Sequence, residues 1–129
     1  MVIDSSAFAA ILLGEAEQTA FIEAITADRT RIAGAATVFE TSIVLLARRG
    51  EAGVADLHAF YARAAVQTAG FEAEHVEVAI DAFRRFGKGR HPAGLNFGDC
   101  FSYALAKTTG EPLLFKGDAF SRTDVERAV

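Results

Sequence analysis

The stretch from Asn96 to Phe120 constrains the fold most, because it predicts a helix, a turn and a buried strand in immediate succession. Gly98 and Asp99 are typical of a helix start, where an aspartate side chain accepts hydrogen bonds from the free N–H groups of the first turn. Gly110 is typical of the residue that follows a helix. The run Leu113–Phe115 is wholly apolar, as expected of a parallel strand that is covered on both faces.

This helix and this strand bring two acids together. The strand runs back antiparallel to the helix, so the start of the helix and the end of the strand lie at the same edge of the sheet. We therefore expect Asp99 and Asp118 to be neighbours in space, although 19 positions separate them in the sequence. Open α/β sheets bind their ligands at this edge.

The rest of the chain alternates between short strand-like runs and helical periods. Three further strands are predicted at Met1–Ile3, Arg31–Ala35 and Val66–Phe71. The first predicted helix has a serine, Ser5 or Ser6, as its N-cap and is closed by Gly14. The remaining predicted elements are helices over Glu15–Asp28, Ala36 or Thr37 to Arg49, Ala52–Ala65 and Glu72–Phe86, and a last edge strand around Thr123–Glu126. Such alternation indicates βαβ crossovers, so we expect one domain over residues 1–129, a three-layer α/β/α sandwich with a central, mostly parallel sheet.

Charge and composition narrow the class of protein. Seventeen acidic residues against thirteen Lys and Arg give a formal net charge of −4, so binding of a polyanion would need a local basic patch or bound cations. The single cysteine, Cys100, excludes an internal disulfide and fits a reducing, cytoplasmic setting. The apolar run Ala7–Leu13 follows Asp4 without a basic leader and is too short to span a bilayer, so no membrane segment is expected.

Four acids stand in apolar surroundings rather than on charged helix faces. Asp4 lies between a buried strand and an apolar helix, and Glu40 is the only charge in TVFETSIVLLA. Asp99 interrupts LNFGDCFSYALA, and Asp118 follows LLFKG. An isolated carboxylate among apolar neighbours is costly unless a cation compensates it. Because the predicted topology collects all four acids at one edge, it predicts a hard divalent site, Mg²⁺ or Mn²⁺, with oxygen ligands.

Each acid also has a purely structural interpretation. Asp99 could be only a helix cap and Asp4 only a turn residue, and this alternative is strongest for Asp118 in KGDAF. Glu40 is harder to explain in this way, because glutamate is rarely buried without a partner. The structural alternative must explain how four independent acids reach one edge, so we favour the metal site.

Several of these motifs together resemble a known family. VIDSSA at the N-terminus, the isolated Glu40, LNFGDCFSYALA and LLFKGDAFSRTDV resemble PIN-domain ribonucleases, and most of all the VapC toxins of bacterial toxin–antitoxin pairs. The resemblance covers essentially the whole chain. It implies a cytoplasmic, metal-dependent endoribonuclease that cleaves RNA phosphodiester bonds, is held inactive by a protein antitoxin and forms a homodimer.

The resemblance also assigns residues. It implies that Asp4, Glu40, Asp99 and Asp118 correspond to the acidic quartet that binds Mg²⁺ or Mn²⁺ in this family, and that Ser6 supports the first aspartate. One position departs from the pattern, because Ala119 stands where the family often has a second acid. Asp124 is therefore an alternative fourth acid.

A cluster of basic residues precedes the Asp99 helix. Four of the thirteen cations, Arg84, Arg85, Lys88 and Arg90, fall within seven positions. We predict that Arg85, Lys88 and Arg90, together with Lys116 nearer the acids, contact RNA phosphates. Arg84 and Arg85 are explained equally well as cations that interact favourably with the C-terminal end of a helix.

Two hypotheses of different classes follow. The first is the metal-dependent ribonuclease, and the second is a catalytically inactive RNA- or protein-binding module of the same fold. Phe8, Leu12, Phe39 and Ile43, on the early helices, are candidates for dimer or antitoxin contacts, although ordinary core packing is the expected role of most of them.

Overall fold

Four short parallel strands form the centre of the molecule. The computed structural model describes residues 1–129, and the sheet has the order β3-β2-β1-β4. These strands are β1 (Val2–Ile3), β2 (Ile32–Gly34), β3 (Gln67–Ala69) and β4 (Leu113–Leu114). Every pairing in the sheet is parallel, with Val2 opposite both Ile32 and Leu113. The predicted parallel sheet is confirmed.

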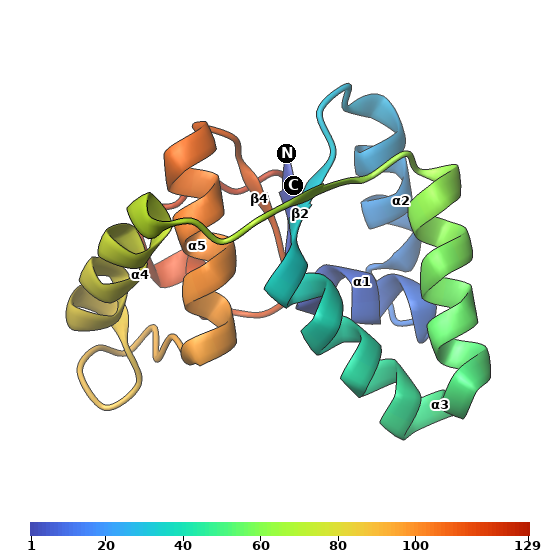
Figure 1. Ribbon diagram of the computed structural model, residues 1–129, viewed down its shortest axis with the longest axis horizontal. Coiled ribbons are helices and arrows are strands. Elements are labelled where there is room, and N and C mark those ends of the chain that lie inside the picture. Colours follow the sequence, from blue (N-terminus) through green and yellow to red (C-terminus); the bar gives the residue numbers. More distant parts are fainter.

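Five helices cover the two faces of this sheet. They are α1 (Ser5–Leu12), α2 (Gln18–Ala27), α3 (Ala35–Arg63), α4 (Ala73–Phe86) and α5 (Phe97–Thr109). Figure 1 shows α4 and α5 on one side of the strands, with α1, α2 and most of α3 on the other. The predicted three-layer α/β/α sandwich is thereby confirmed. None of the helices combines the length and apolarity needed to cross a lipid bilayer.

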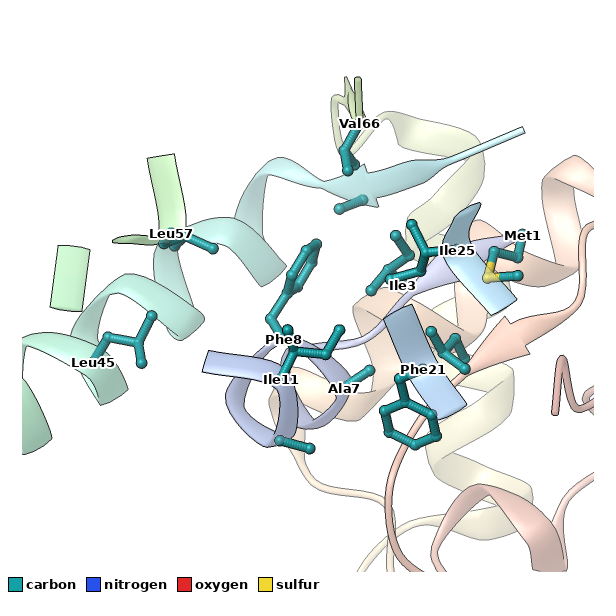
Figure 2. Close-up of a cluster of buried hydrophobic side chains, with 13 residues drawn as sticks. Met1, Ile3, Ala7, Phe8, Ile11, Phe21, Ile25, Leu45, Leu57 and Val66 are labelled. Atoms are coloured by element: carbon teal, nitrogen blue, oxygen red, sulfur yellow. The ribbon is translucent and has the colours of Figure 1, made fainter. Parts of the chain in front are cut away.

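The two sides of the sheet carry separate hydrophobic clusters, because successive strand residues point to opposite faces. Val2 packs with α4 and α5, whereas Ile3 packs with α1 and α2, and both side chains are fully buried. Figure 2 shows the second cluster, where Phe8 of α1 and Ile25 of α2 lie near Ile3. Each such side chain contributes roughly 1.5–3 kcal/mol of burial energy. The sheet that carries Asp4 is thus fixed from both faces.

One long helix replaces the two helices that the sequence predicted over Thr37–Arg49 and Ala52–Ala65. α3 runs through both, and only Gly50 leaves helical geometry, with φ 64° and ψ −156°. This backbone conformation is open almost exclusively to glycine, because it lacks a Cβ. The resulting bend turns the second half of α3 back along α2 (Figure 1). The predicted break is therefore a kink.

The C-terminal segment also differs from its prediction as an edge strand. After β4 the chain forms a 3₁₀ turn over Phe120–Arg122 and then makes a single parallel bridge, Leu113 to Arg127. The Leu113 N–H donates to the carbonyl of Glu126 at 2.8 Å, and the Ala128 N–H donates to the carbonyl of Leu113 at 2.9 Å. This bridge covers the edge of β4 at Arg127, one residue beyond the predicted range Thr123–Glu126.

Candidate active site and metal centre

Asp4 is the most deeply buried acid of the candidate site, with only 2% of its surface exposed. It follows β1 directly and is the N-cap of α1, a role that the sequence analysis gave to a serine. Its Oδ2 accepts hydrogen bonds from the Ser6 backbone N–H at 2.9 Å and from Ser6 Oγ at 2.6 Å, and its Oδ1 accepts one from Ser102 Oγ at 2.6 Å. Three neutral donors therefore hold this carboxylate in one orientation.

Ser6 connects this carboxylate to the segment after β4. Besides donating to Asp4, its Oγ accepts a hydrogen bond from the Lys116 backbone N–H at 3.0 Å. The start of α1 and the segment leading to Asp118 are thus joined at the carboxyl ends of β1 and β4. The supporting contact that the family resemblance implied for Ser6 is present.

Asp99 lies in the first turn of α5, but it is not the N-cap that the sequence suggested. Asn96 is the N-cap, and the two residues form a reciprocal capping box. Asn96 Oδ1 accepts from the Asp99 N–H at 2.8 Å, and Asp99 Oδ2 accepts from the Asn96 N–H at 2.9 Å. The other oxygen of Asp99, Oδ1, has no hydrogen-bond donor from the protein.

Glu40 reaches the same place from α3, where it lies in the second turn rather than the first turn expected from the sequence. Its carboxylate rests against the backbone of Gly98. A Cβ built on Gly98 would lie 2.5 Å from Glu40 Oε2, closer than any real contact of this kind. The absence of a side chain at residue 98 therefore leaves the space that the Glu40 carboxylate occupies beside Asp99.

The three carboxylates influence one another electrostatically. Burial raises the pKa of Glu40, and the charges of Asp4 and Asp99 raise it further, against a hydrogen bond from Ser5. Burial and the charge of Asp4 also raise the pKa of Asp99 to about 6, although the hydrogen bond from Asn96 lowers it. No Lys, Arg or His side chain forms an ion pair with any of the three. No cationic side chain therefore compensates the repulsion among the three carboxylates.

This arrangement fits a hard divalent cation in its chemistry. The donors are carboxylate oxygens, the site has excess negative charge, and Gly98 leaves room for the Glu40 carboxylate. In their present conformations, however, no three His, Cys, Asp or Glu side chains are placed to hold a metal ion together. Coordination by all three would require the carboxylates to move closer together, and Asp99 would contribute its Oδ1, which accepts no hydrogen bond.

The structure separates the two candidates for the fourth acid. Asp118 is exposed in the turn after β4, and no hydrogen bond or ion pair involves its carboxylate; it stays a predicted ligand. Asp124 accepts hydrogen bonds from Tyr103 Oη at 2.7 Å and from Arg85 at 3.1 Å. Burial acts to raise the pKa of Asp124, but these bonds outweigh burial and lower it to about 2. Asp124 is therefore already compensated by protein groups.

The predicted RNA-binding cations fall into two groups. Arg85 is paired with Asp81 and Asp124, at 3.3 and 3.1 Å. Lys116 Nζ lies 2.6 Å from Glu15 Oε2 and 3.1 Å from Glu17 Oε2, the latter at ion-pair distance but without hydrogen-bond geometry. In contrast, Lys88 and Arg90 are exposed on the loop before α5 and form no ion pair.

Sequence reasoning missed two hydroxyl residues of the site. Ser102 donates to Asp4, and Thr37 Oγ1 lies 3.3 Å from Ser102 Oγ. Because the Ser102 proton is directed to Asp4, Thr37 acts as the donor in the second bond. Ser102 lies three residues after Asp99, and Thr37 three residues before Glu40, so each shares a helix face with an acid. That spacing in otherwise apolar helices is the signal that would have identified them.

Apolar side chains are exposed on both sides of the acids. Phe8 is buried and Leu12 packs against the core, as the structural alternative predicted, but Phe39 is 69% exposed. With Ile43 and Leu46 it forms an exposed stripe along α3. On α4, Val76 and Ile80 are exposed and line an apolar groove of about 430 Å³ between α4 and α5.

Comparison with known proteins agrees with this fold. The sequence of residues 1–126 matches the family model of the PIN domain. Together with a parallel α/β/α sheet whose carboxyl edge gathers acids, this match defines the class of protein: the chain belongs to the PIN-domain family.

Within that class the chain is similar to proteins named VapC. It is 50% identical over 125 residues to the ribonuclease VapC of Mycolicibacterium smegmatis, covering 97% of both sequences. It is 48% identical over 125 residues to the ribonuclease VapC30 of Mycobacterium tuberculosis, covering 97% of this chain and 95% of that relative.

A solved structure supports the fold independently. The crystal structure of Mycobacterium tuberculosis VapC20, described as a sarcin-ricin loop cleaving toxin, superposes with a TM-score of 0.77 at 20% sequence identity. The match covers 96% of this chain and 95% of that one. The architecture is therefore shared even where the sequence has diverged.

Proposed function

We propose that this protein is an endoribonuclease that hydrolyses RNA phosphodiester bonds and acts as the toxin of a type II toxin–antitoxin pair. One observation carries the chemistry: carboxylates from the end of β1, from α3 and from α5 approach one another with no cationic side chain among them. The relatives named VapC ribonuclease supply the reaction class. We further propose that cleavage depends on Mg²⁺ or Mn²⁺.

We assign a role to each acid from the hydrogen bonds that hold it. Asp4, fixed by Ser6 and Ser102, is the rigid ligand, whereas Asp99 offers its unbonded Oδ1. Glu40 and Asp118 are the outer pair, which bind a second ion or orient its waters. Bound divalent ions supply polarisation of the scissile phosphate and a lowered pKa of a coordinated water. Ser6, Ser102 and Thr37 act through Asp4 as positioning residues.

We also propose partners for this protein. The names of the relatives support a cognate protein antitoxin, and the exposed stripe Phe39, Ile43 and Leu46 is the surface we assign to the antitoxin or to a second copy in a homodimer. Lys88 and Arg90 are the RNA-phosphate contacts favoured by their exposure. Arg85 and Lys116 could contribute only after breaking their ion pairs. We place the protein in the cytoplasm.

An inactive binding module of the same fold is the second candidate, and one substitution separates it from the enzyme. Asp99→Asn keeps the shape of the side chain and the capping bond that residue 99 accepts from Asn96, but it removes the charge that would bind metal. We expect Asp99→Asn to abolish Mn²⁺-dependent cleavage of total RNA, measured by mapping cleavage ends with and without the metal. Asp124→Asn is the matched control, because Asp124 is already paired, and it should retain activity.

Thermal unfolding provides a second readout. Binding to the folded state stabilises it by about 2.7 kcal/mol when the free metal concentration is 100 times Kd. Wild-type protein should therefore gain thermal stability on Mn²⁺ titration, whereas Asp99→Asn should not. If the wild type neither cleaves RNA nor responds to Mn²⁺, the binding module is the correct alternative.

A further inference from the structure

Phe97 is exposed to an unusual degree for its type. With 80% of its surface exposed, it is the most exposed of the large hydrophobic residues at the surface. Phe97 immediately precedes Gly98, whose backbone contacts the Glu40 carboxylate, and lies two residues before Asp99. The residue is therefore placed at the rim of the acid cluster. Exposing a phenylalanine gives up its burial energy, so a role outside the core is expected.

The Phe97 ring is nevertheless supported. It lies 4.8 Å from the ring of Phe101 at 90°, and Phe101 lies 4.5 Å from the ring of Phe71 at 65°. Edge-to-face contacts of this kind favour a defined orientation. The row of rings holds Phe97 in place while most of its surface faces solvent. Such a ring is a preformed platform that loses little conformational entropy when a flat ligand stacks on it.

Charge limits the other ways in which RNA could bind near the acids. The chain has a net charge of −4, the three carboxylates repel phosphates, and Lys116 is occupied by Glu15 and Glu17. A contact that does not depend on charge is therefore the favourable kind at this rim. Stacking of a nucleobase on an aromatic side chain is such a contact, because every base has an uncharged π face.

Resting on the ribonuclease function proposed above, we propose that Phe97 is a stacking platform for a nucleobase next to the scissile phosphate. The groove that Phe97 and Phe101 border is lined only by apolar side chains, so it offers no hydrogen bonds to base edges. The platform therefore positions the strand without selecting the base. Phe97 is a substrate-binding residue, and it takes no part in metal binding.

Two substitutions at one position test this assignment. Phe97→Leu keeps an apolar side chain and removes the aromatic face, whereas Phe97→Trp keeps an aromatic face. We would measure the Kd for a short fluorescein-labelled, single-stranded RNA of mixed sequence by anisotropy, in the Asp99→Asn background so that the RNA stays intact. Phe97→Leu should raise Kd about tenfold, as expected for one lost stacked base, and Phe97→Trp should leave it unchanged or lower it.

Further readouts separate stacking from other roles. The dependence of Kd on salt should be the same in both variants, because stacking releases no counterions. With residue 99 intact, Phe97→Leu should lower the cleavage rate at low RNA concentration but not at saturation. Equal Kd values for Phe97, Leu and Trp would overturn the proposal. So would a change in molar mass for Phe97→Leu in light scattering, which would assign Phe97 to a contact with a second copy.

Failure of the stacking assignment can be distinguished from failure of the ribonuclease function on which it rests. If wild-type protein fails to cleave RNA with Mn²⁺, the ribonuclease assignment fails whatever the Phe97 variants do. If wild-type protein cleaves RNA but Phe97→Leu binds as tightly as wild type, only the stacking assignment fails.

Discussion

The acids of the site differ in how tightly each is held. Asp4 accepts three hydrogen bonds, so an asparagine there would turn an N–H₂ group toward at least one donor. Leaving a buried polar group unsatisfied costs about 1–3 kcal/mol, which makes Asp4→Asn an ambiguous test of catalysis. Asp99 has one oxygen without a hydrogen bond, so an asparagine there leaves no donor facing an N–H₂ group. The effect of Asp99→Asn is therefore due to the loss of charge alone.

Burial of the Asp99 carboxyl group, together with repulsion from Asp4, should make the metal-free protein less stable as this group ionises. The pKa of Asp99 is about 6 in the folded state against an ordinary 3.8, so the folded state binds this proton more tightly. Stability in EDTA should therefore fall as pH rises from 3.8 to about 6 and level off above that. Glu40, whose pKa is also raised, adds to the fall. The pKa of Asp124 is lowered to about 2, so ionisation of Asp124 changes stability only at more acidic pH.

Asp99→Asn should reduce this slope and stabilise the metal-free protein at pH 7 by about 1 kcal/mol, a value discounted for solvent screening. The measurement is thermal unfolding in EDTA across the pH range, and saturating Mn²⁺ should remove the difference in slope. Asp124→Asn is the opposite control and should destabilise the protein. A metal-free protein that becomes more stable between pH 3.8 and about 6 would contradict the raised pKa of Asp99.

At the scale of elements, the site depends on how closely α3 approaches α5. Glu40 of α3 reaches Asp99 only because Gly98 has no side chain, and the kink at Gly50 allows the rest of α3 to fold back along α2. The loop and the capping box before α5 fix where that helix begins. The geometry of the acids is therefore a property of two helix starts and one strand end.

Gly98→Ala should separate stability from metal binding. The new Cβ would meet the flexible end of Glu40 rather than backbone, so Glu40 can swing away at little cost. The helix gains up to about 1 kcal/mol in propensity. We expect unchanged or slightly higher thermal stability in EDTA, with Mn²⁺ affinity lowered about tenfold or more. Unchanged Mn²⁺ affinity in a calorimetric titration would mean that Glu40 is not a ligand.

At the scale of the whole molecule, an acidic protein has to bind a polyanion with few available cations. Arg85 and Lys116 are occupied by acids, which leaves Lys88 and Arg90 on the loop that leads into α5. The overall charge of −4 makes their contribution dependent on salt.

Replacing Arg90 and, separately, Arg85 by glutamine tests whether only the cations without ion pairs contact RNA phosphates. Arg90→Gln should lower the dependence of log Kd on log salt by about 0.7, the value for one phosphate contact with a single strand, without changing stability. Arg85→Gln should leave that slope unchanged and lower the unfolding temperature slightly, because it breaks exposed ion pairs. Binding isotherms at several salt concentrations, with thermal unfolding alongside, measure both. Equal slopes for Arg90→Gln and wild type would exclude the phosphate contact.

The amino-acid sequence by itself determined the order of elements, the parallel sheet and the meeting of Asp4, Glu40 and Asp99. These follow from local periodicity and from the geometry of βαβ crossovers, which places strand ends and the following helix starts at one edge. Only the tertiary structure decided that Ser102 and Thr37 support Asp4, that Arg85 neutralises Asp124, and that Phe39 and Phe97 stay exposed. Periodicity shows that a helix has an apolar face, but packing between distant segments selects which residues on it find partners.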